Sequence, residues 1–320
     1  MHVSDRPART NLMSACSISA PLSCISVAGA SAARDVLSRQ DDGVLETLVD
    51  RMIIDLDNTA CGRGYADIPD PLRGTVSRRS DFAALLVAKL LADAPARAAK
   101  RSMPVALLPE LLRHSQRILA TYTPDLPGRV WLSDDVFLKD LSICRLDAFA
   151  GVSQVIEQGA RIPVGDLVKG SPSHALRLGR TLSANGFRKS PYLEIHTHTP
   201  MLDGFHPAGW DDCYTLAAQL LEARPDHLGM IGASWFYDPN LAIISPRLAY
   251  LAEVPRNGGA IFFRVGSDQS DVDLATATSP TRRRLAECGL YRPTRHLMIW
   301  PRKKMLAWAA KRAAAVEALA

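Results

Sequence analysis

The stretch Tyr192-Leu-Glu-Ile-His-Thr-His-Thr-Pro200 combines the pattern of a half-buried strand with a dense group of titratable side chains. In an extended strand alternate side chains share one face, so Glu194, His196 and His198 are expected to project together. Further β-prone runs follow this stretch, and helical patterns separate them. Strand and helix therefore alternate to the C-terminus, which predicts an α/β (α+β) fold with a mixed sheet covered by helices.

The expected elements on both sides of this stretch follow from periodicity. β-prone runs occupy residues 129–132, 141–146, 152–157, 192–198, 228–237, 260–265 and 296–300. Helical patterns occupy residues 45–56, 82–91, 107–119, 211–223, 245–254, 281–288 and 303–319. In the first of these, Leu45, Val49 and Met52 lie on one face of an amphipathic helix. The acidic residues near position 134 are interpreted as a turn: Asp134, Asp135 and Asp140.

Composition divides the chain into three regions. Residues 1–40 contain a Ser/Ala-rich run and are expected to form a disordered tail, although their basic start is also similar to an export signal. Residues 41–103 are expected to form a helical region with a Pro/Gly/Arg-rich linker at 62–79. Residues 104–320 are expected to form a mixed α/β domain of catalytic type.

The charge and hydropathy of the chain exclude several classes of protein. The 320 residues include 38 Lys and Arg against 33 Asp and Glu, a formal net charge of +5 that does not require a nucleic-acid partner. No apolar run approaches the ~18 residues of a membrane-spanning helix, so no membrane partner is expected. The six cysteines form no CxxC pair, which favours free thiols and a cytoplasmic location. A small-molecule substrate is expected, and the composition leaves the oligomeric state open.

One carboxylate beside two imidazoles suits either proton transfer or metal binding. Glu194, His196 and His198 can accept and pass protons as a general base. With Asp203 or His206, the same residues supply three or four ligands of the types that Zn²⁺ or Fe²⁺ accept. No further histidine lies at a spacing that clearly completes a ligand set, so we expect acid–base chemistry without a metal. In the structural alternative, the histidines only form hydrogen bonds on a half-buried sheet face.

The order of elements over residues 192–302 resembles that of the acetyl-CoA-dependent N-acyltransferase superfamily: strand, loop, helix, strand, helix, strand, helix, strand. In some members the strand before the cofactor loop carries a Glu general base or a His-x-His pair, and Glu194, His196 and His198 stand at the matching place. The resemblance implies an enzyme that transfers an acyl group from acetyl-CoA or another acyl thioester to an amine.

The resemblance departs from the family at the cofactor loop. The Arg/Gln-x-x-Gly-x-Gly/Ala turn, whose backbone amides hold a pyrophosphate at a helix N-terminus, is absent. Gly204 and Gly209 are the glycines that the corresponding loop offers for cofactor binding. Arg283, in an arginine run at the start of a late helix, is the further candidate for a cofactor phosphate.

Other classes of function stay open. His196-Thr-His-Thr-Pro-Met-Leu-Asp-Gly204 is similar to the first strand of a group of metal-dependent phosphoesterases. Met52-Ile-Ile-Asp-Leu-Asp-Asn-Thr59 is similar to the opening motif of the haloacid-dehalogenase-like phosphatases, in which Asp55 would attack phosphorus and Asp57 would act as acid and base near Mg²⁺. A non-catalytic ligand-binding domain could use the same sheet face. No Gly-x-Ser-x-Gly, P-loop or dinucleotide-binding motif occurs.

Overall fold

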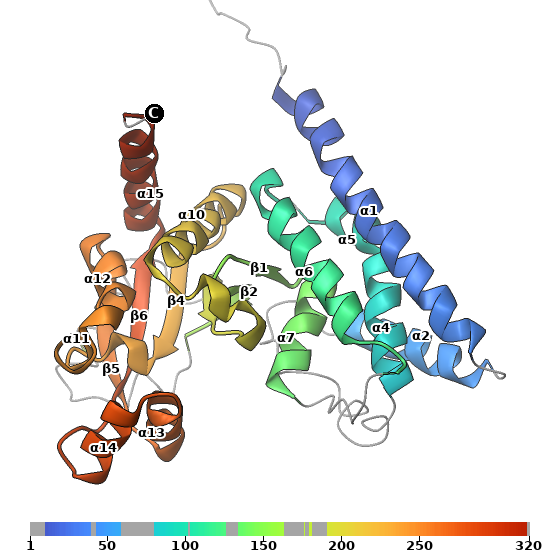
Figure 1. Cartoon of the computed structure of the whole chain (residues 1–320). Coiled ribbons are helices and arrows are strands. Elements are labelled where there is room, and N and C mark those ends of the chain that lie inside the picture. Colours follow the sequence, from blue (N-terminus) through green and yellow to red (C-terminus); the bar gives the residue numbers. More distant parts are fainter. Residues whose placement is uncertain are drawn as a thin grey trace, which may run out of the picture. The chain divides into compact units, whose positions relative to one another are not determined.

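The computed structural model describes residues 10–39, 43–58, 80–101, 103–125, 134–162, 176, 179–180 and 191–318, with side chains from residue 19 onward. The chain divides into two compact units, Met1–Gly151 and Val152–Ala320. The described part of the first unit is mainly helical, and the second is built around a sheet with helices (Figure 1). The boundary expected near residue 103 falls inside the first unit. The linker expected at 62–79 and the β-prone run at 129–132 lie outside the described residues.

The helices of the first unit pack around one buried helix. In chain order they are α1 (Thr10–Ser38), α2 (Val44–Asp57), α4 (Ser80–Ala92), α5 (Ala94–Ala99), η1 (Val105–Leu107), α6 (Leu108–Thr121) and α7 (Asp135–Cys144), before the short strand β1 (Ala148–Ala150). Helix α4 is buried along most of its length, as its almost continuous apolar sequence requires. It contacts α1, α2, α6 and α7, so the two helices beyond residue 103 belong to the same helical core.

The expectation of a disordered tail over residues 1–40 is wrong for the described part, because α1 is a long helix. Its buried residues recur every three or four positions: Leu22, Ile25, Gly29, Ala33 and Val36. A Cβ atom on Gly29 would stand 2.5 Å from the backbone nitrogen of Ala92, so the backbone of α1 lies directly against α4. Small residues permit this close approach of the two backbones. A Ser/Ala-rich composition is also typical of disordered segments, so the sequence without its partner helix suggested disorder.

Residues 134–146 form a helix and its end, which corrects the expected turn and strand. Asp134 caps α7 by accepting a hydrogen bond of 3.0 Å from the backbone nitrogen of Val136. Asp140 is fully buried and accepts bonds from Arg117 and from the hydroxyl of Tyr122. A short apolar run such as 141–146 does not distinguish a buried strand from a buried helix. Here the N-cap at Asp134 favours the helix.

The second unit holds a mixed sheet, as the alternation of strands and helices predicts. Its strands are β2 (Val155–Ala160), β3 (Tyr192–His196), β4 (Gly229–Ser234), β5 (Ile261–Gly266) and β6 (Arg295–Pro301), and they lie side by side in the order β2-β3-β4-β6-β5. Strands β3 and β4 are parallel, whereas the pairs β2–β3, β4–β6 and β5–β6 are antiparallel.

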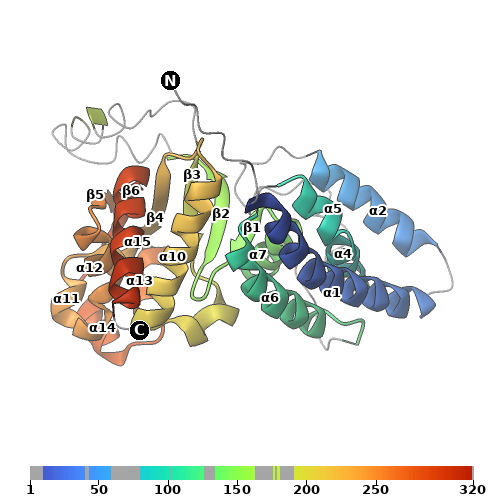
Figure 2. The same ribbon diagram turned by 90° about the horizontal axis from the view of Figure 1, so that it is seen from above.

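Helices connect the strands of this unit, and α15 follows the last strand. The described helices are η2 (Thr199–Gly204), α10 (Pro207–Ala223), η3 (Trp235–Tyr237), α11 (Leu241–Ile244), η4 (Pro246–Leu248), α12 (Tyr250–Asn257), α13 (Gln269–Thr276), α14 (Pro280–Glu287) and α15 (Arg302–Glu317). Helix α10 is the crossover that a parallel β3–β4 pair requires. It contacts α15, and both lie against the sheet in Figure 2.

Two apolar clusters hold the sheet. On the face that carries Tyr192, a core cluster includes Ile231, Phe263 and Ile299. Toward α10 and α15, the ring of Tyr214 meets Trp300 edge to face with centroids 5.2 Å apart. The strands around the candidate site are therefore held by packing on both faces.

Replacing Gly29 with alanine is expected to destabilise the first unit, although alanine is the better helix former. The added methyl group would overlap the backbone of α4, and overpacking of this kind costs about 1–3 kcal/mol, more than the ~1 kcal/mol gained in helix propensity. Denaturant unfolding followed by circular dichroism measures the change. Gly43→Ala is the matched control, because nothing lies within 4 Å of a Cβ there. An unchanged or increased stability of Gly29→Ala would contradict the close α1–α4 contact.

Candidate functional site

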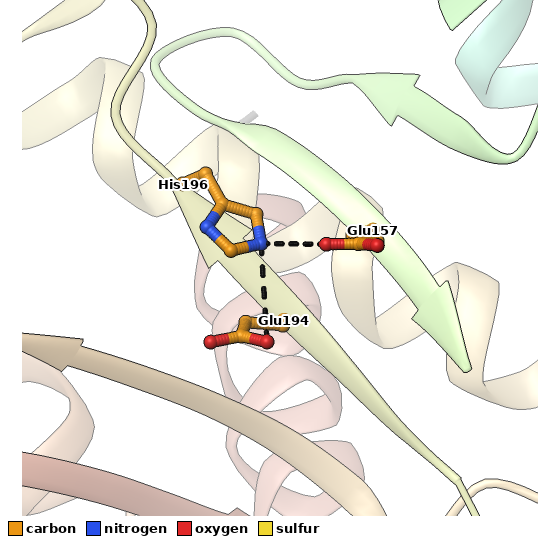
Figure 3. A group of neighbouring side chains, drawn as sticks. All are labelled: Glu157, Glu194 and His196. Atoms are coloured by element: carbon orange, nitrogen blue, oxygen red, sulfur yellow. Dashed lines mark hydrogen bonds and ion pairs between the residues drawn. The ribbon is translucent and has the colours of Figure 1, made fainter. Parts of the chain in front are cut away.

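Three titratable side chains meet across β2 and β3. The antiparallel register sets Glu157 opposite Glu194, and Val155 opposite His196. Nε2 of His196 lies 2.8 Å from Oε2 of Glu157 and 3.9 Å from Oε2 of Glu194 (Figure 3). We call Glu157, Glu194 and His196 the carboxylate–imidazole cluster; one ligand atom from each residue lies within 4.8 Å of the others.

Strand geometry explains most of this cluster. Glu194 and His196 are two positions apart on β3, so they share a face, as the sequence predicts. Glu157 comes from the neighbouring strand and was not identified from the sequence. The available signal was a carboxylate at the end of the β-prone run 152–157, because an ionised side chain at a buried strand position needs a partner.

His198 does not join the cluster, which corrects the expected group of three residues on one strand. Strand β3 ends at His196, and His198 is the buried residue that precedes η2. Its carbonyl oxygen accepts a 2.8 Å hydrogen bond from the backbone nitrogen of Met201. Pro200 favours this early end of the strand, because proline has no N–H to donate to a ladder.

The other residues considered as metal ligands also lie elsewhere. Asp203 is exposed on η2. Nδ1 of His206 accepts a 3.1 Å hydrogen bond from the backbone nitrogen of Gly209, so this histidine caps α10. Among the described residues, the group that brings metal-ligating atoms together contains Glu157 in place of His198, Asp203 or His206.

Close packing and helix capping account for the three residues expected to bind a cofactor. A Cβ on Gly204 would stand 2.2 Å from the carbonyl oxygen of Val152, and one on Gly209 would stand 2.2 Å from that of Gly204. Both positions therefore need glycine for a close backbone approach at the start of α10. Arg283 donates a 2.9 Å hydrogen bond to the carbonyl oxygen of Ala277, just beyond the end of α13.

The parallel strands β3 and β4 pair over only a short length. Their register consists of Leu193 opposite Met230 and Glu194 opposite Ile231, although β3 continues to His196 and β4 to Ser234. Strand β4 stays paired with β6 along its whole length. The parallel pairing therefore stops at Glu194, and we call the region between the carboxyl ends of the two strands the β3–β4 opening.

Two buried tyrosine hydroxyls lie beside this opening. A Cβ on Gly232 of β4 would stand 3.0 Å from Cγ1 of Ile195 and 3.1 Å from the hydroxyl of Tyr237, which also interacts with the hydroxyl of Tyr214. Burial raises the pKa of both tyrosines far above the ordinary value, and the charge of Glu194 raises that of Tyr237 further. Both hydroxyls are therefore protonated at neutral pH.

The segment similar to a phosphatase motif is part of a helix. Asp55 and Asp57 lie on α2, where Asp57 forms hydrogen bonds of 2.8 and 3.0 Å with Arg97. A nucleophilic aspartate of that motif would follow a buried strand. The structure does not provide the secondary structure that the phosphatase hypothesis needs, and Thr59 lies outside the described residues.

Comparisons of the chain with protein-family models, with curated proteins and with solved structures gave no match. Within the part of the chain that the structure describes, no helix combines the length and the apolar character needed to cross a membrane. Function is therefore inferred from the geometry of the cluster and of the β3–β4 opening.

In an alkaline titration, the described tyrosines of the folded chain are expected to stay protonated at the pH at which free tyrosine ionises. Burial raises the pKa of Tyr192 and of Tyr250 to about 12, and it also raises those of Tyr214 and Tyr237 well above the ordinary value. Unfolded tyrosine ionises near pH 10, so the stability from tyrosine burial is complete below pH 10 and is lost as the pH rises through the folded pKa values.

Tyrosinate absorption and circular dichroism, recorded together against pH, measure this behaviour. Most of the ionisation is expected to coincide with unfolding. Ionisation of most tyrosines near pH 10, with the fold intact, would contradict the buried environment of these rings.

Proposed function

We propose that the second unit is an acyltransferase that moves an acyl group from a thioester to an amine. The observation that carries the proposal is the β3–β4 opening, which has the carboxylate–imidazole cluster toward one face of the sheet and the hydroxyl of Tyr237 toward the other. The two faces follow from strand alternation, because Glu194 and His196 point away from the face to which Ile195 points. A base and an acid on opposite sides of one opening suit the transfer of an acyl group between two ligands.

The β3–β4 opening suits an extended ligand. Parallel strands that part leave backbone amides along their inner edges, and a ligand that carries amide groups can pair with them as an added strand. In open sheets, ligands bind outside the carboxyl ends of adjacent parallel strands. Acetyl-CoA, the donor that the resemblance implies, is a long thioester with amide groups. The element order β3, α10, β4, α12, β5, α14, β6 supports this donor, because the resemblance depends on that order.

The cluster is arranged to accept the proton of the amine. Glu157 is buried and hydrogen-bonded to His196, so it orients the imidazole and stabilises the positive charge that forms when the ring is protonated. Glu194 lies 3.9 Å from the same ring nitrogen and adds a second negative charge. In this scheme Glu194 and His196 face the substrate, and Glu157 is a positioning residue.

Acyl transfer then exchanges one bond of the acyl carbon for another. The amine nitrogen forms a bond to the thioester carbonyl carbon while its proton passes to the cluster, and the carbon–sulfur bond breaks. The departing thiolate takes a proton from the hydroxyl of Tyr237. After the products leave, that hydroxyl regains a proton from solvent and the cluster releases one to solvent. The products are an amide and a free thiol. The expected setting is the cytoplasm, in keeping with the free thiols of Cys24, Cys144, Cys213 and Cys288.

Removing the imidazole is expected to lower kcat by on the order of 10²–10⁴, because the amine then loses its general base. The assay measures thiol release from acetyl-CoA with a panel of small amines, for the intact chain and for His196→Ala. Asp203→Asn is the control, since this exposed carboxylate lies near β3 in sequence but outside the cluster. Calorimetry comes first: an absence of acetyl-CoA binding at about 1 mM would refute the proposal. Unchanged kcat in His196→Ala would remove the assigned base.

The role of Tyr237 predicts a dependence on the leaving group. Tyr237→Phe keeps the buried ring and removes only the hydroxyl, so it is expected to slow transfer from acetyl-CoA by about 10²-fold or more. Transfer from an aryl thioester, whose more acidic thiol leaves without a proton, is expected to be restored toward wild type. Tyr214→Phe is the matched control and should have a smaller effect. An equal loss with both donors would show that the hydroxyl has only a structural role.

A further inference from the structure

The register of β2 and β3 creates an electrostatic problem at the cluster. Glu157 and Glu194 are directly opposite one another, and like charges at such positions are destabilising. The carboxylate of Glu157 is also buried, which is costly unless a positive charge compensates it. A protonated His196 supplies one such charge. A divalent cation between the same three side chains would supply two positive charges.

We propose that Glu157, Glu194 and His196 bind a divalent transition-metal ion of the Zn²⁺ class, and that the bound ion inhibits acyl transfer. The metal site stands on the geometry of the cluster alone. The inhibition rests on the proposed function, because it assumes that the same residues accept the amine proton.

The spacing of the ligand atoms fits such an ion. Nitrogen and oxygen ligands about 2.0–2.2 Å from a tetrahedral Zn²⁺ stand roughly 3.3–3.6 Å from one another. The separations from Nε2 of His196, 2.8 Å to Glu157 and 3.9 Å to Glu194, lie on either side of this range. Small side-chain rotations therefore bring the three atoms to ligand distances. Three protein ligands leave one coordination position open for water.

The chemistry and the location of the cluster also select this class of metal. One imidazole with two carboxylates suits Zn²⁺, whereas Mg²⁺ and Ca²⁺ prefer oxygen ligands alone. The ligands stand on two paired strands, so the backbone holds them in place. The side chains of Glu194 and His196 are 27% and 19% exposed, which gives an ion access from solvent.

Metal binding and base catalysis exclude one another at this cluster. The ion would bind Nε2 of His196, so the neutral ring would keep its one proton on Nδ1 and would have no lone pair left to accept the proton of the amine. The ion would also neutralise the carboxylate of Glu194, which faces the substrate in the proposed scheme. Zinc would therefore act as a reversible inhibitor, removed by a chelator.

Calorimetric titration of the chelator-treated full chain with ZnCl₂, in a buffer that does not bind zinc, tests the site. We expect the wild-type chain to bind one ion. In Glu157→Gln, Glu194→Gln and His196→Ala, we expect this binding to be lost or its affinity to fall more than about tenfold, because substitution of residues that only support a metal ligand already costs about tenfold or more. Asp203→Asn and His198→Ala are the controls and should bind as wild type does. MgCl₂ should bind far more weakly than ZnCl₂.

Circular dichroism of each variant separates loss of ligand from loss of fold. Should Glu157→Gln unfold, Glu194→Gln decides, because Glu194 is partly exposed. Folded variants that bind zinc as tightly as wild type would overturn the site, and so would a wild-type chain that binds none.

The activity assay distinguishes the two proposals. Zinc binding that depends on the three residues, in a chain without acyltransferase activity, would leave the metal site standing and refute the proposed function. Acyltransferase activity that zinc does not reduce at saturating metal would refute the inhibition. Activity lost on adding zinc and recovered with a chelator is the expected result.

Discussion

The antiparallel register of β2 on β3 is the constraint on which the candidate site depends. It sets Glu157 opposite Glu194, so that a buried carboxylate reaches an imidazole on the next strand. Because side chains alternate between the faces of a sheet, a slip of one residue would move Glu157 to the other face and separate it from His196. The chemistry of the cluster is therefore a property of strand pairing, and β3 alone supplies only part of it.

The parallel pair β3–β4 adds the second half of the site. A parallel pair requires a crossover, and α10 provides it over the face of the sheet that carries Trp300, against which Tyr214 of α10 packs. Backbone contacts that only glycine permits draw the start of α10 close to the end of η2, at Gly204 and Gly209. The chain can therefore return within a few residues from the end of β3 into α10. The same crossover brings Tyr214 to Tyr237, beside the end of the parallel pairing.

Buried polar groups follow one rule in both units. In the helical unit, Asp140 is tolerated in the core because Arg117 and Tyr122 donate hydrogen bonds to it. In the sheet unit, Glu157 is tolerated because His196 lies within hydrogen-bonding distance. The first group pairs one carboxylate with a guanidinium and a hydroxyl, whereas the second sets two carboxylates around one imidazole. An imidazole between two carboxylates is what makes the cluster on β2 and β3 a candidate for chemistry.

Local periodicity was sufficient to predict the mixed α/β architecture, the helices α2, α4 and α6, and the shared face of Glu194 and His196, because these depend on residues close together in the chain. It placed His198 and residues 141–146 in strands, and composition predicted a disordered tail for residues 1–40. The structure differs from these predictions because the chain turns early before Pro200, because Asp134 caps a helix, and because Gly29 fits against α4. Only the tertiary structure could bring Glu157 to His196, because pairing between strands far apart in sequence is set by packing of the whole sheet, which no local pattern encodes.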